Sequence, residues 1–221
     1  MTITVAFDGP DYSGKSTTVA KVAKILEGLG LRVGVANHPQ ALTETGRYAR
    51  LQLVSGKAND IVARAMCQDF EYTLHNMVPR FDVVLCDRWA PVTIANQGDE
   101  GKEEVFRTGI CNMPGSPTIY VSMEVGYETA VKRNQKRLEE KGHDWDAAVS
   151  GKMFVSPEAW EAACARYRYA FQILTEGGNK FEWIQLNEKT SQFAALDVAA
   201  KIVRAYADEL QERNPTATMI A

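Results

Sequence analysis

One segment restricts the fold of this chain more than any other, the run from Gly9 to Thr17. It reads Gly-Pro-Asp-Tyr-Ser-Gly-Lys-Ser-Thr, which fits the phosphate-binding P-loop pattern G-x-x-x-x-G-K-[ST], and it directly follows the apolar run Ile3 to Phe7. In this pattern the glycines let backbone amides surround a phosphate group, Lys15 reaches the outer phosphates, and the hydroxyl of Ser16 binds Mg2+. The order of strand, loop and helix therefore predicts a nucleotide-binding α/β fold.

Short β-type runs alternate with helical segments along the chain. The expected strands are Thr2–Phe7, Arg32–Ala36, Asp82–Cys86, Thr118–Val125 and Phe181–Leu186. The expected helices are Ser16–Leu29, Thr43–Val54, Asp60–Val78, Gly126–Glu140, Pro157–Thr175 and Gln192–Arg213, with a short one at Lys102–Gly109. This alternation predicts a three-layer α/β fold, in which helices flank a five-stranded parallel sheet. The polar stretch at about 139–156 contains two glycines and is expected to form a small lid.

Length and composition predict one domain at residues 1–213 and a flexible tail at 214–221, because 221 residues with 45% hydrophobic content suffice for one buried core. The net charge of −3 gives no basic surplus for a nucleic-acid polymer, so the expected partner is a small molecule that carries phosphate. The four cysteines have neither metal-ligand nor disulfide spacing. No apolar stretch approaches the roughly 20 residues that cross a bilayer, and we expect a cytoplasmic protein without membrane contact.

A second group of polar residues follows the third expected strand, at Asp87, Arg88 and Trp89. Open α/β sheets bind ligands at the carboxyl ends of their strands, which is where these residues stand. An aspartate there can hold Mg2+ directly or through water, and Arg88 can grip a second phosphate group with two parallel hydrogen bonds. The alternative is an ion pair at the end of the strand. Together with the P-loop, the pattern favours a phosphoryl-transfer site.

The two segments together resemble the thymidylate kinase family of nucleoside monophosphate kinases. Asp87-Arg-Trp-Ala-Pro-Val-Thr-Ile-Ala-Asn-Gln-Gly98 is similar to the family's D-R-Y-x-x-S-x-x-A-Y-Q-G, and Thr43-Glu-Thr-Gly46 is similar to its T-E-x-G. Further similarity lies in Thr118-Ile-Tyr-Val-Ser-Met-Glu-Val125 and in Glu128-Thr-Ala-Val-Lys-Arg133. The resemblance covers nearly the whole chain. It implies ATP and Mg2+ as cofactors, a nucleotide as the acceptor, and a homodimer packed through helices such as Asp60–Val78.

The resemblance also implies roles for single residues. The residues expected to bind ATP are Gly9, Asp11, Tyr12, Ser13, Gly14, Lys15, Ser16 and Thr17. Ser16 and Asp87 are the expected Mg2+ ligands. Arg88 is expected to bind the acceptor phosphate, and Asp11 is expected to face the acceptor sugar. The loop Asn187-Glu188-Lys189 is expected to lie near the adenine.

The cation on the transferring phosphoryl group is expected to come from outside the P-loop. Some relatives carry an arginine within the loop, where this chain has Tyr12, so Arg133 or Arg137 should supply that charge. These two arginines stand four apart on one helix face, which suits a clamp and equally suits a solvated face. The expected catalytic residues are Lys15, Asp11, Arg88, Arg133 and Arg137, and Arg166 and Arg168 are the alternatives.

The acceptor side departs from the family pattern. The family has an arginine just before the proline of the loop after the second strand, where this chain reads Asn37-His38-Pro39. In the helix that holds the base, Ala65 and Asp69 align with a stacking phenylalanine and an arginine, although Phe70 is close by. The family's serine and tyrosine after Asp-Arg-Tyr become Val92 and Asn96, and that tyrosine crowds the 2′ position of the sugar. The residues expected to contact the acceptor are Asp11, His38, Asp69, Phe70, Arg88, Trp89, Asn96 and Gln97.

Two explanations of these departures stay open. Either the alignment shifts by a residue or two and Phe70 or His38 takes the missing role, or the pocket is rebuilt for another acceptor. Asp69 favours rebuilding, because a carboxylate prefers a donor such as an exocyclic amine or a hydroxymethyl group to the carbonyl edge of thymine. Alternatively, Asp69 simply faces solvent on an amphipathic helix.

The expected function is transfer of the γ-phosphoryl group of ATP to a pyrimidine deoxynucleotide, such as dTMP or a modified dUMP or dCMP. One alternative is a P-loop kinase of a nucleoside or modified-pyrimidine hydroxyl, with Asp11 or Asp87 as the base, because such an acceptor needs no phosphate-binding arginines. Another alternative is an inactive nucleotide-binding protein. The retained Lys15, Ser16 and Arg88 argue against that last class.

Overall fold

The structure is a computed structural model, and it describes residues 2–55, 59–98, 116–141, 156–176, 181–187 and 193–213. Five strands form one sheet whose order is β2-β3-β1-β4-β5, and every neighbouring pair is parallel. The strands are β1 (Ile3–Asp8), β2 (Val33–Asn37), β3 (Val83–Asp87), β4 (Ile119–Met123) and β5 (Glu182–Leu186). The predicted five-stranded parallel sheet is therefore confirmed.

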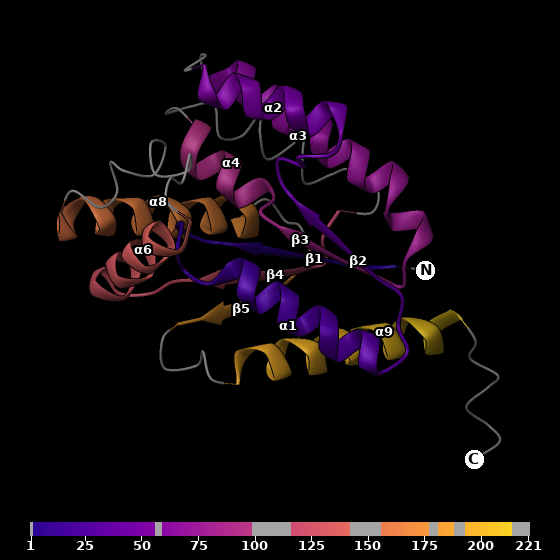
Figure 1. Cartoon of the computed structure of the whole chain (residues 1–221). Coiled ribbons are helices and arrows are strands. Elements are labelled where there is room, and N and C mark those ends of the chain that lie inside the picture. The colour runs from indigo at the N-terminus through magenta and orange to yellow at the C-terminus, as the bar shows by residue number, and fades with distance from the viewer. Residues whose placement is uncertain are drawn as a thin grey trace.

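Helices cover both faces of the sheet (Figure 1). One face packs against α1 (Lys15–Gly28) and α9 (Ala194–Arg213). The other face packs against α3 (Asn59–Asn76), α4 (Ala90–Gln97) and α8 (Pro157–Glu176). The remaining helical elements lie beside these layers and are α2 (Glu44–Val54) next to α3, the 3-10 turn η1 (Val78–Arg80), and α6 (Tyr127–Lys141) next to α8.

The central strand β1 shows why the sheet is buried on both faces. All six of its residues are buried. Val5 and Phe7 pack with α1 and α9, whereas Ala6 packs with α4 and α8 on the opposite face. Successive side chains of a strand point to opposite faces, so a strand covered on both sides is largely apolar, as Ile3, Val5 and Phe7 are here. The apolar run in the sequence is the direct consequence.

The predicted strands and long helices are found within two residues of their expected ends. The sequence did not predict α4 or η1. The helix expected at Asp60–Val78 ends at Asn76, and η1 follows it. The predicted short helix Lys102–Gly109, most of the lid segment (142–155) and the tail 214–221 lie outside the described residues.

The strand register decides which residues meet at the carboxyl edge of the sheet. Asp87 of β3 pairs with Phe7 of β1 and with Asn37 of β2. Asp8 of β1 pairs with Ser122 of β4. Because all five strands are parallel, the loops that follow β1, β2, β3 and β4 leave the sheet at this one edge. A site assembled from distant parts of the sequence is therefore expected there.

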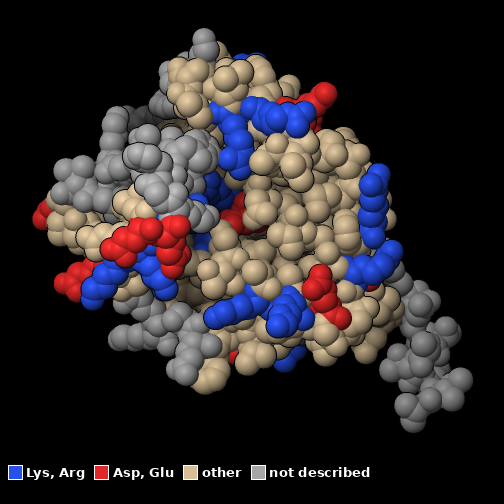
Figure 2. Space-filling view, in the orientation of Figure 1, with Lys and Arg blue, Asp and Glu red and all other residues tan. Residues whose placement is uncertain are grey.

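The surface of the molecule carries both signs of charge. On the face seen in Figure 2 basic and acidic side chains are interspersed, and atoms of both kinds lie together in a hollow near its centre. Among the described helices, none is both long and apolar enough to cross a membrane.

Candidate active site

The P-loop forms the turn between β1 and α1, and its two glycines cannot be replaced without a shift of the backbone or of a neighbouring side chain. Gly9 has a φ of +148°, and a Cβ atom there would lie 2.1 Å from the carbonyl oxygen of Met123 on β4. Gly14 has a φ of +103°, and a Cβ atom there would lie 3.2 Å from a guanidinium nitrogen of Arg133. The first glycine thus lets β1 approach β4, and the second lets a cation approach the loop.

Lys15 lies inside the P-loop. Its Nζ donates hydrogen bonds to the carbonyl oxygens of Gly9 (2.8 Å) and Pro10 (2.7 Å), and it lies 3.4 Å from the hydroxyl of Ser13. Only 5% of the residue is exposed, and burial lowers the pKa of the ammonium group from its ordinary value. The carbonyl groups therefore hold a poorly solvated cation at a position where it would contact a bound phosphate group.

The two predicted metal ligands are brought together. The Ser16 hydroxyl at the start of α1 donates a hydrogen bond of 2.5 Å to Oδ2 of Asp87 at the end of β3. Hydroxyl and carboxylate oxygens are the hard ligands that Mg2+ prefers, and Mg2+ usually completes its shell with water and substrate phosphates. Among the described residues no three His, Cys, Asp or Glu side chains form a group that could hold a metal ion.

Arg88 and Asp11 form an ion pair across the mouth of the P-loop. The guanidinium Nη2 lies 2.5 Å from Oδ1 of Asp11, and the two side chains remain 29% and 21% exposed. Burial would raise the pKa of Asp11, but the charges of Arg88 and Lys15 outweigh it and hold that pKa below its ordinary value. Arg88 has a φ of +77°, and its amide donates to the carbonyl oxygen of Phe7, so its backbone is fixed against β1. The pair thus presents a partly exposed guanidinium group beside the P-loop.

A second cation reaches the P-loop from α6. Nη1 of Arg133 donates a hydrogen bond of 3.0 Å to the carbonyl oxygen of Tyr12, and Cζ of Arg137 lies 5.7 Å from the centre of the Tyr12 ring. The two predicted clamp residues therefore both contact the loop. Arg166 is exposed on α8. Arg168 forms ion pairs with Glu124 and Glu161 and not with a P-loop residue in either of these contacts.

Asp8 links the P-loop strand to α4, and sequence reasoning gave it no role. Its Oδ1 accepts hydrogen bonds from the amides of Trp89 (3.0 Å) and Val92 (3.2 Å), so it caps the first turn of a helix that has no side-chain cap of its own. Its Oδ2 is buried and has no hydrogen-bond partner among the described residues. Burial raises the pKa of Asp8 to about 7. An acid at the end of a buried strand, directly before the first P-loop glycine, was the available sequence signal.

Four of the predicted acceptor contacts lie in the core instead. His38 is 3% exposed, and Asp69, Phe70 and Trp89 are each 0% exposed. The rings of His38, Phe70 and Trp89 pack on one another with centroids 4.4 to 5.3 Å apart. The alternative expectation that the Asp69 carboxylate faces solvent is wrong, because this side chain is 0% exposed. In this conformation other residues cover these four side chains, so none of them presents an exposed surface to a ligand.

Two further predicted acceptor residues, Asn96 and Gln97, lie on α4. Asn96 is exposed, and its Nδ2 donates a hydrogen bond of 3.3 Å to the hydroxyl of Tyr167 on α8. Gln97 is the last residue of α4 and is only 9% exposed. Tyr167 is a residue that sequence reasoning missed. Burial raises the pKa of its hydroxyl above the ordinary value, and the charges of Asp11 and Arg88 also act on that hydroxyl.

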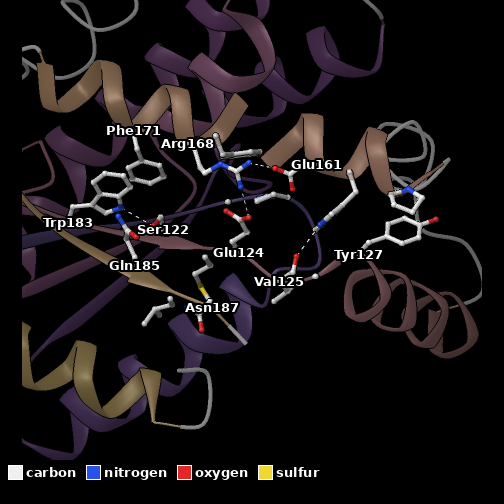
Figure 3. A pocket seen from close by; sticks show the side chains of 18 residues that line it. Ser122, Glu124, Val125, Tyr127, Glu161, Arg168, Phe171, Trp183, Gln185 and Asn187 are labelled. Atoms are coloured by element: carbon white, nitrogen blue, oxygen red, sulfur yellow. Dashed lines mark hydrogen bonds and ion pairs between the residues drawn. The ribbon is translucent and has the colours of Figure 1, made fainter. Parts of the chain in front are cut away.

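A pocket of about 910 Å³ opens beside Gly9 and Pro10, between α8 and the ends of β4 and β5 (Figure 3). Phe171 and Trp183 stack in parallel in its wall, with centroids 5.1 Å apart, and the Trp183 indole donates to the hydroxyl of Ser122. Arg168 bridges Glu124 and Glu161 across another part of the wall. The other lining residues named in Figure 3 are Val125, Tyr127, Gln185 and Asn187. A pocket of this volume and aromatic character suits a small ligand.

A parallel sheet with a P-loop after its central strand, an aspartate beside the P-loop serine and two arginines in contact with the loop define a nucleotide kinase of the P-loop class. Comparison with known proteins narrows the class. The family model described as thymidylate kinase matches residues 7–148, which is more than half of the chain, and the chain belongs to the thymidylate kinase family.

Two relatives agree with this assignment, and a solved structure shares the fold. The thymidylate kinase of Staphylococcus haemolyticus is 30% identical over 158 residues, which are 64% of this chain and 76% of that protein. The thymidylate kinase of Caldicellulosiruptor saccharolyticus is 29% identical over 140 residues, which are 58% and 68% of the two chains. The crystal structure of thymidylate kinase from Ehrlichia chaffeensis has the same fold, with a TM-score of 0.61, 15% identity, and coverage of 91% of this chain and 98% of that one.

Proposed function

We propose that the protein transfers the γ-phosphoryl group of ATP, with Mg2+, to a pyrimidine deoxynucleotide such as dTMP or a modified dUMP or dCMP. The observation that carries this proposal is the convergence of two arginines on consecutive P-loop residues. Arg88 from the end of β3 contacts Asp11, and Arg133 from α6 contacts the carbonyl oxygen of Tyr12. Phosphoryl transfer relies on positioning and on cations around the transferred group, so two cations that meet at the P-loop suit a donor and an acceptor phosphate.

On the donor side, the P-loop amides and Lys15 would hold the outer phosphates of ATP. Ser16 and Asp87 would hold Mg2+, which when bound neutralises charge on the phosphate oxygens. The Nζ atom of Lys15 now bonds to two loop carbonyls, and it would exchange those bonds for phosphate oxygens. Arg133 would stabilise the charge on the transferring group.

On the acceptor side, Arg88 would bind the phosphate group of the nucleotide. The guanidinium group is held by Asp11 and stays partly exposed, so it is available at the mouth of the loop. Asp11 would also face the sugar. Asn96 and Gln97 of α4 remain as proposed contacts, with Asn96 placed by its hydrogen bond to Tyr167.

A kinase of a nucleoside or modified-pyrimidine hydroxyl is the second candidate. The position just before Pro39, where the family carries a cation, holds His38 here, and that side chain is buried against Asp69. An acceptor without a phosphate group would need no cation there. In that case Asp11 or Asp87 would accept the proton of the attacking hydroxyl.

A coupled ADP-release assay tests the proposal and separates the candidates. The panel contains ATP, Mg2+ and the ribo and deoxy forms of pyrimidine and purine monophosphates and nucleosides, with 5-substituted pyrimidines included. Turnover on pyrimidine deoxynucleotides is the expected result. Turnover on nucleosides alone would support the second candidate, and ATP binding without turnover on any acceptor would support an inactive nucleotide-binding protein.

We also propose a homodimer that forms through α2 and α3. These helices expose Tyr48, Leu51, Val54, Ile61 and Tyr72, each more than a third exposed. Large apolar side chains that gather on a surface are typical of an interface. Sedimentation of the wild-type protein should give a dimer, and Leu51→Glu should shift it to the monomer. A monomeric wild-type protein at micromolar concentration would exclude this proposal.

A further inference from the structure

The carboxylate of Asp69 on α3 is the centre of a buried hydrogen-bond network. It accepts bonds from Nδ1 of His38 (2.7 Å), the amide of Gln40 (2.9 Å), and the hydroxyls of Thr45 (3.0 Å) and Thr43 (3.1 Å). The side-chain Nε2 atom of Gln40 lies 3.4 Å from Oδ1 of Asp69. Both carboxylate oxygens take part. A buried carboxylate with this many donors is satisfied, and it has no unused oxygen with which to read a ligand.

All of these donors belong to one stretch of chain, residues 38–45, which we call the β2–α2 segment. His38 begins it directly after β2, Thr43 is the N-cap of α2, where its hydroxyl accepts from the amide of Gly46, and Thr45 ends it in the first turn of α2. Two further bonds fasten the segment. Arg50 donates to the carbonyl oxygen of Pro39, and Gln40 donates to the hydroxyl of Thr73 on α3. The segment is therefore folded around the side chain of Asp69.

The charge of Asp69 holds this arrangement in place. Burial alone would raise the pKa of this carboxyl group, but the hydrogen bond and charge of His38 and the bonds from Gln40 and Thr45 hold the pKa below its ordinary value. Asp69 is thus a negative charge in a fixed place, and hydrogen bonds to a charged group are stronger than neutral ones.

The β2–α2 segment is connected to the proposed acceptor site through His38. The amide of His38 donates a hydrogen bond of 3.0 Å to the carbonyl oxygen of Asp87, which directly precedes Arg88. The His38 ring meets the ring of Trp89 edge to face, with centroids 5.3 Å apart. His38, which Asp69 holds, therefore contacts both chain neighbours of Arg88, Asp87 and Trp89. A shift of His38 would move the backbone that carries the guanidinium group.

We propose that Asp69 is a positioning residue for the acceptor site, which fixes the β2–α2 segment and, through His38, the backbone that carries Arg88. It does not read the base. This inference rests on the proposed nucleotide kinase function. It replaces the prediction that Asp69 selects an amino-bearing base, because the oxygens that such a base would need are occupied by the segment.

Asp69→Asn tests the proposal against the alternative that Asp69 contacts the base. The KM of every nucleotide acceptor should rise by the same factor, about tenfold, because weaker loop bonds misplace Arg88 for all of them. The KM of ATP should stay unchanged. The ratio of kcat/KM between an amino-bearing base (dCMP) and a carbonyl-bearing base (dTMP) should also stay unchanged. A change in that ratio would overturn the proposal, and so would a lower kcat with unchanged acceptor KM, which is the result of a purely structural defect.

Two further variants keep the test decisive. Thr45→Val removes one donor to Asp69 and no charge, so it should fold and show the same pattern with a smaller rise in acceptor KM. Glu71→Gln removes a carboxylate charge from an exposed position two residues further along α3, and it should change nothing. A rise in acceptor KM for Glu71→Gln equal to that of Asp69→Asn would overturn the proposal.

Amide hydrogen exchange separates a failure of this inference from a failure of the proposed function. The amides of Gln40 and His38 bond to Asp69 and Asp87, and both should exchange faster in Thr45→Val than in the wild type, whatever the enzyme phosphorylates. Amides of the distant strand β5 should not change. Faster exchange in a protein that phosphorylates no nucleotide would leave the positioning intact and reject the function. Unchanged exchange at His38 and Gln40 would overturn the positioning itself.

Discussion

The hydroxyl of Ser16 lies 2.5 Å from a carboxylate oxygen of Asp87, although 71 residues separate them in the chain. Ser16 lies in the first turn of α1, and Asp87 is the last residue of β3, which pairs with β1 in the sheet. The parallel register therefore builds the metal-binding corner of the proposed site before any ligand arrives. Preorganised oxygens of this kind cost no rearrangement when the nucleotide and its metal bind.

Lys15→Ala should reduce phosphoryl transfer by about a hundredfold or more, because it removes the cation that the P-loop carbonyls hold for the outer phosphates. The measurement is kcat in the ADP-release assay together with a thermal melt. The melt should stay cooperative. Lys21→Ala, at an exposed position of the same helix, is the matched control and should keep wild-type activity. Near-normal turnover of Lys15→Ala would remove the basis of the P-loop assignment.

Arg88→Ala should raise the KM for a nucleotide acceptor by about tenfold to a hundredfold, the worth of a charge-assisted hydrogen bond. The KM for ATP should change much less. Arg88→Lys keeps the charge without the two-pronged geometry, so its KM should lie between those of the wild type and the alanine variant. Steady-state kinetics with each substrate varied in turn gives the KM for ATP and the KM for the acceptor in each variant. An unchanged acceptor KM would show that Arg88 does not bind a phosphate group of the acceptor.

Arg133→Ala should lower kcat by about a thousandfold with little change in either KM, as expected for a cation that acts on the transition state. Arg137→Ala should have a smaller effect, because the Cζ atom of its guanidinium group lies 5.7 Å from the centre of the Tyr12 ring. Arg204→Ala, at an exposed position of α9, provides the control and should be silent. Single-turnover measurements check the assignment, and a larger loss for Arg137→Ala would exchange the two roles.

The stability of the protein should fall as the pH rises from about 4 to about 7, through the buried carboxyl group of Asp8. Its pKa is raised from 3.8 to about 7 in the folded state, so between these values the folded state binds the proton and the unfolded state does not. The full effect is on the order of 4 kcal/mol in the free energy of unfolding. Asp8→Asn keeps an oxygen for the amides of Trp89 and Val92 but has no charge. Urea unfolding at pH 5 and pH 8 should therefore show a weaker loss of stability in this variant, and equal losses would contradict the raised pKa.

The P-loop residues and the arginines of α6 could be predicted from the sequence because their signals are local. A P-loop pattern contains its own glycines, lysine and serine, and Arg133 and Arg137 share a helix face at a spacing of four residues. The helix α4 was missed because its signals are weak. It is only eight residues long, begins with Ala-Pro, and takes its N-terminal cap from Asp8, more than 80 residues away.

The sequence alone determined the alternation of strands and helices, the phosphate-binding loop and the membership of a kinase class, because these depend on periodicity and on residues close together in the chain. Only the tertiary structure decided that four side chains are buried, those of His38, Asp69, Phe70 and Trp89. They come from three separate elements, and the packing of α3 against the β2 and β3 ends turned them from expected ligand contacts into core. Whether a polar side chain faces a ligand or a buried partner depends on which other side chains reach it, and residues 31 apart, such as His38 and Asp69, meet only in the folded chain.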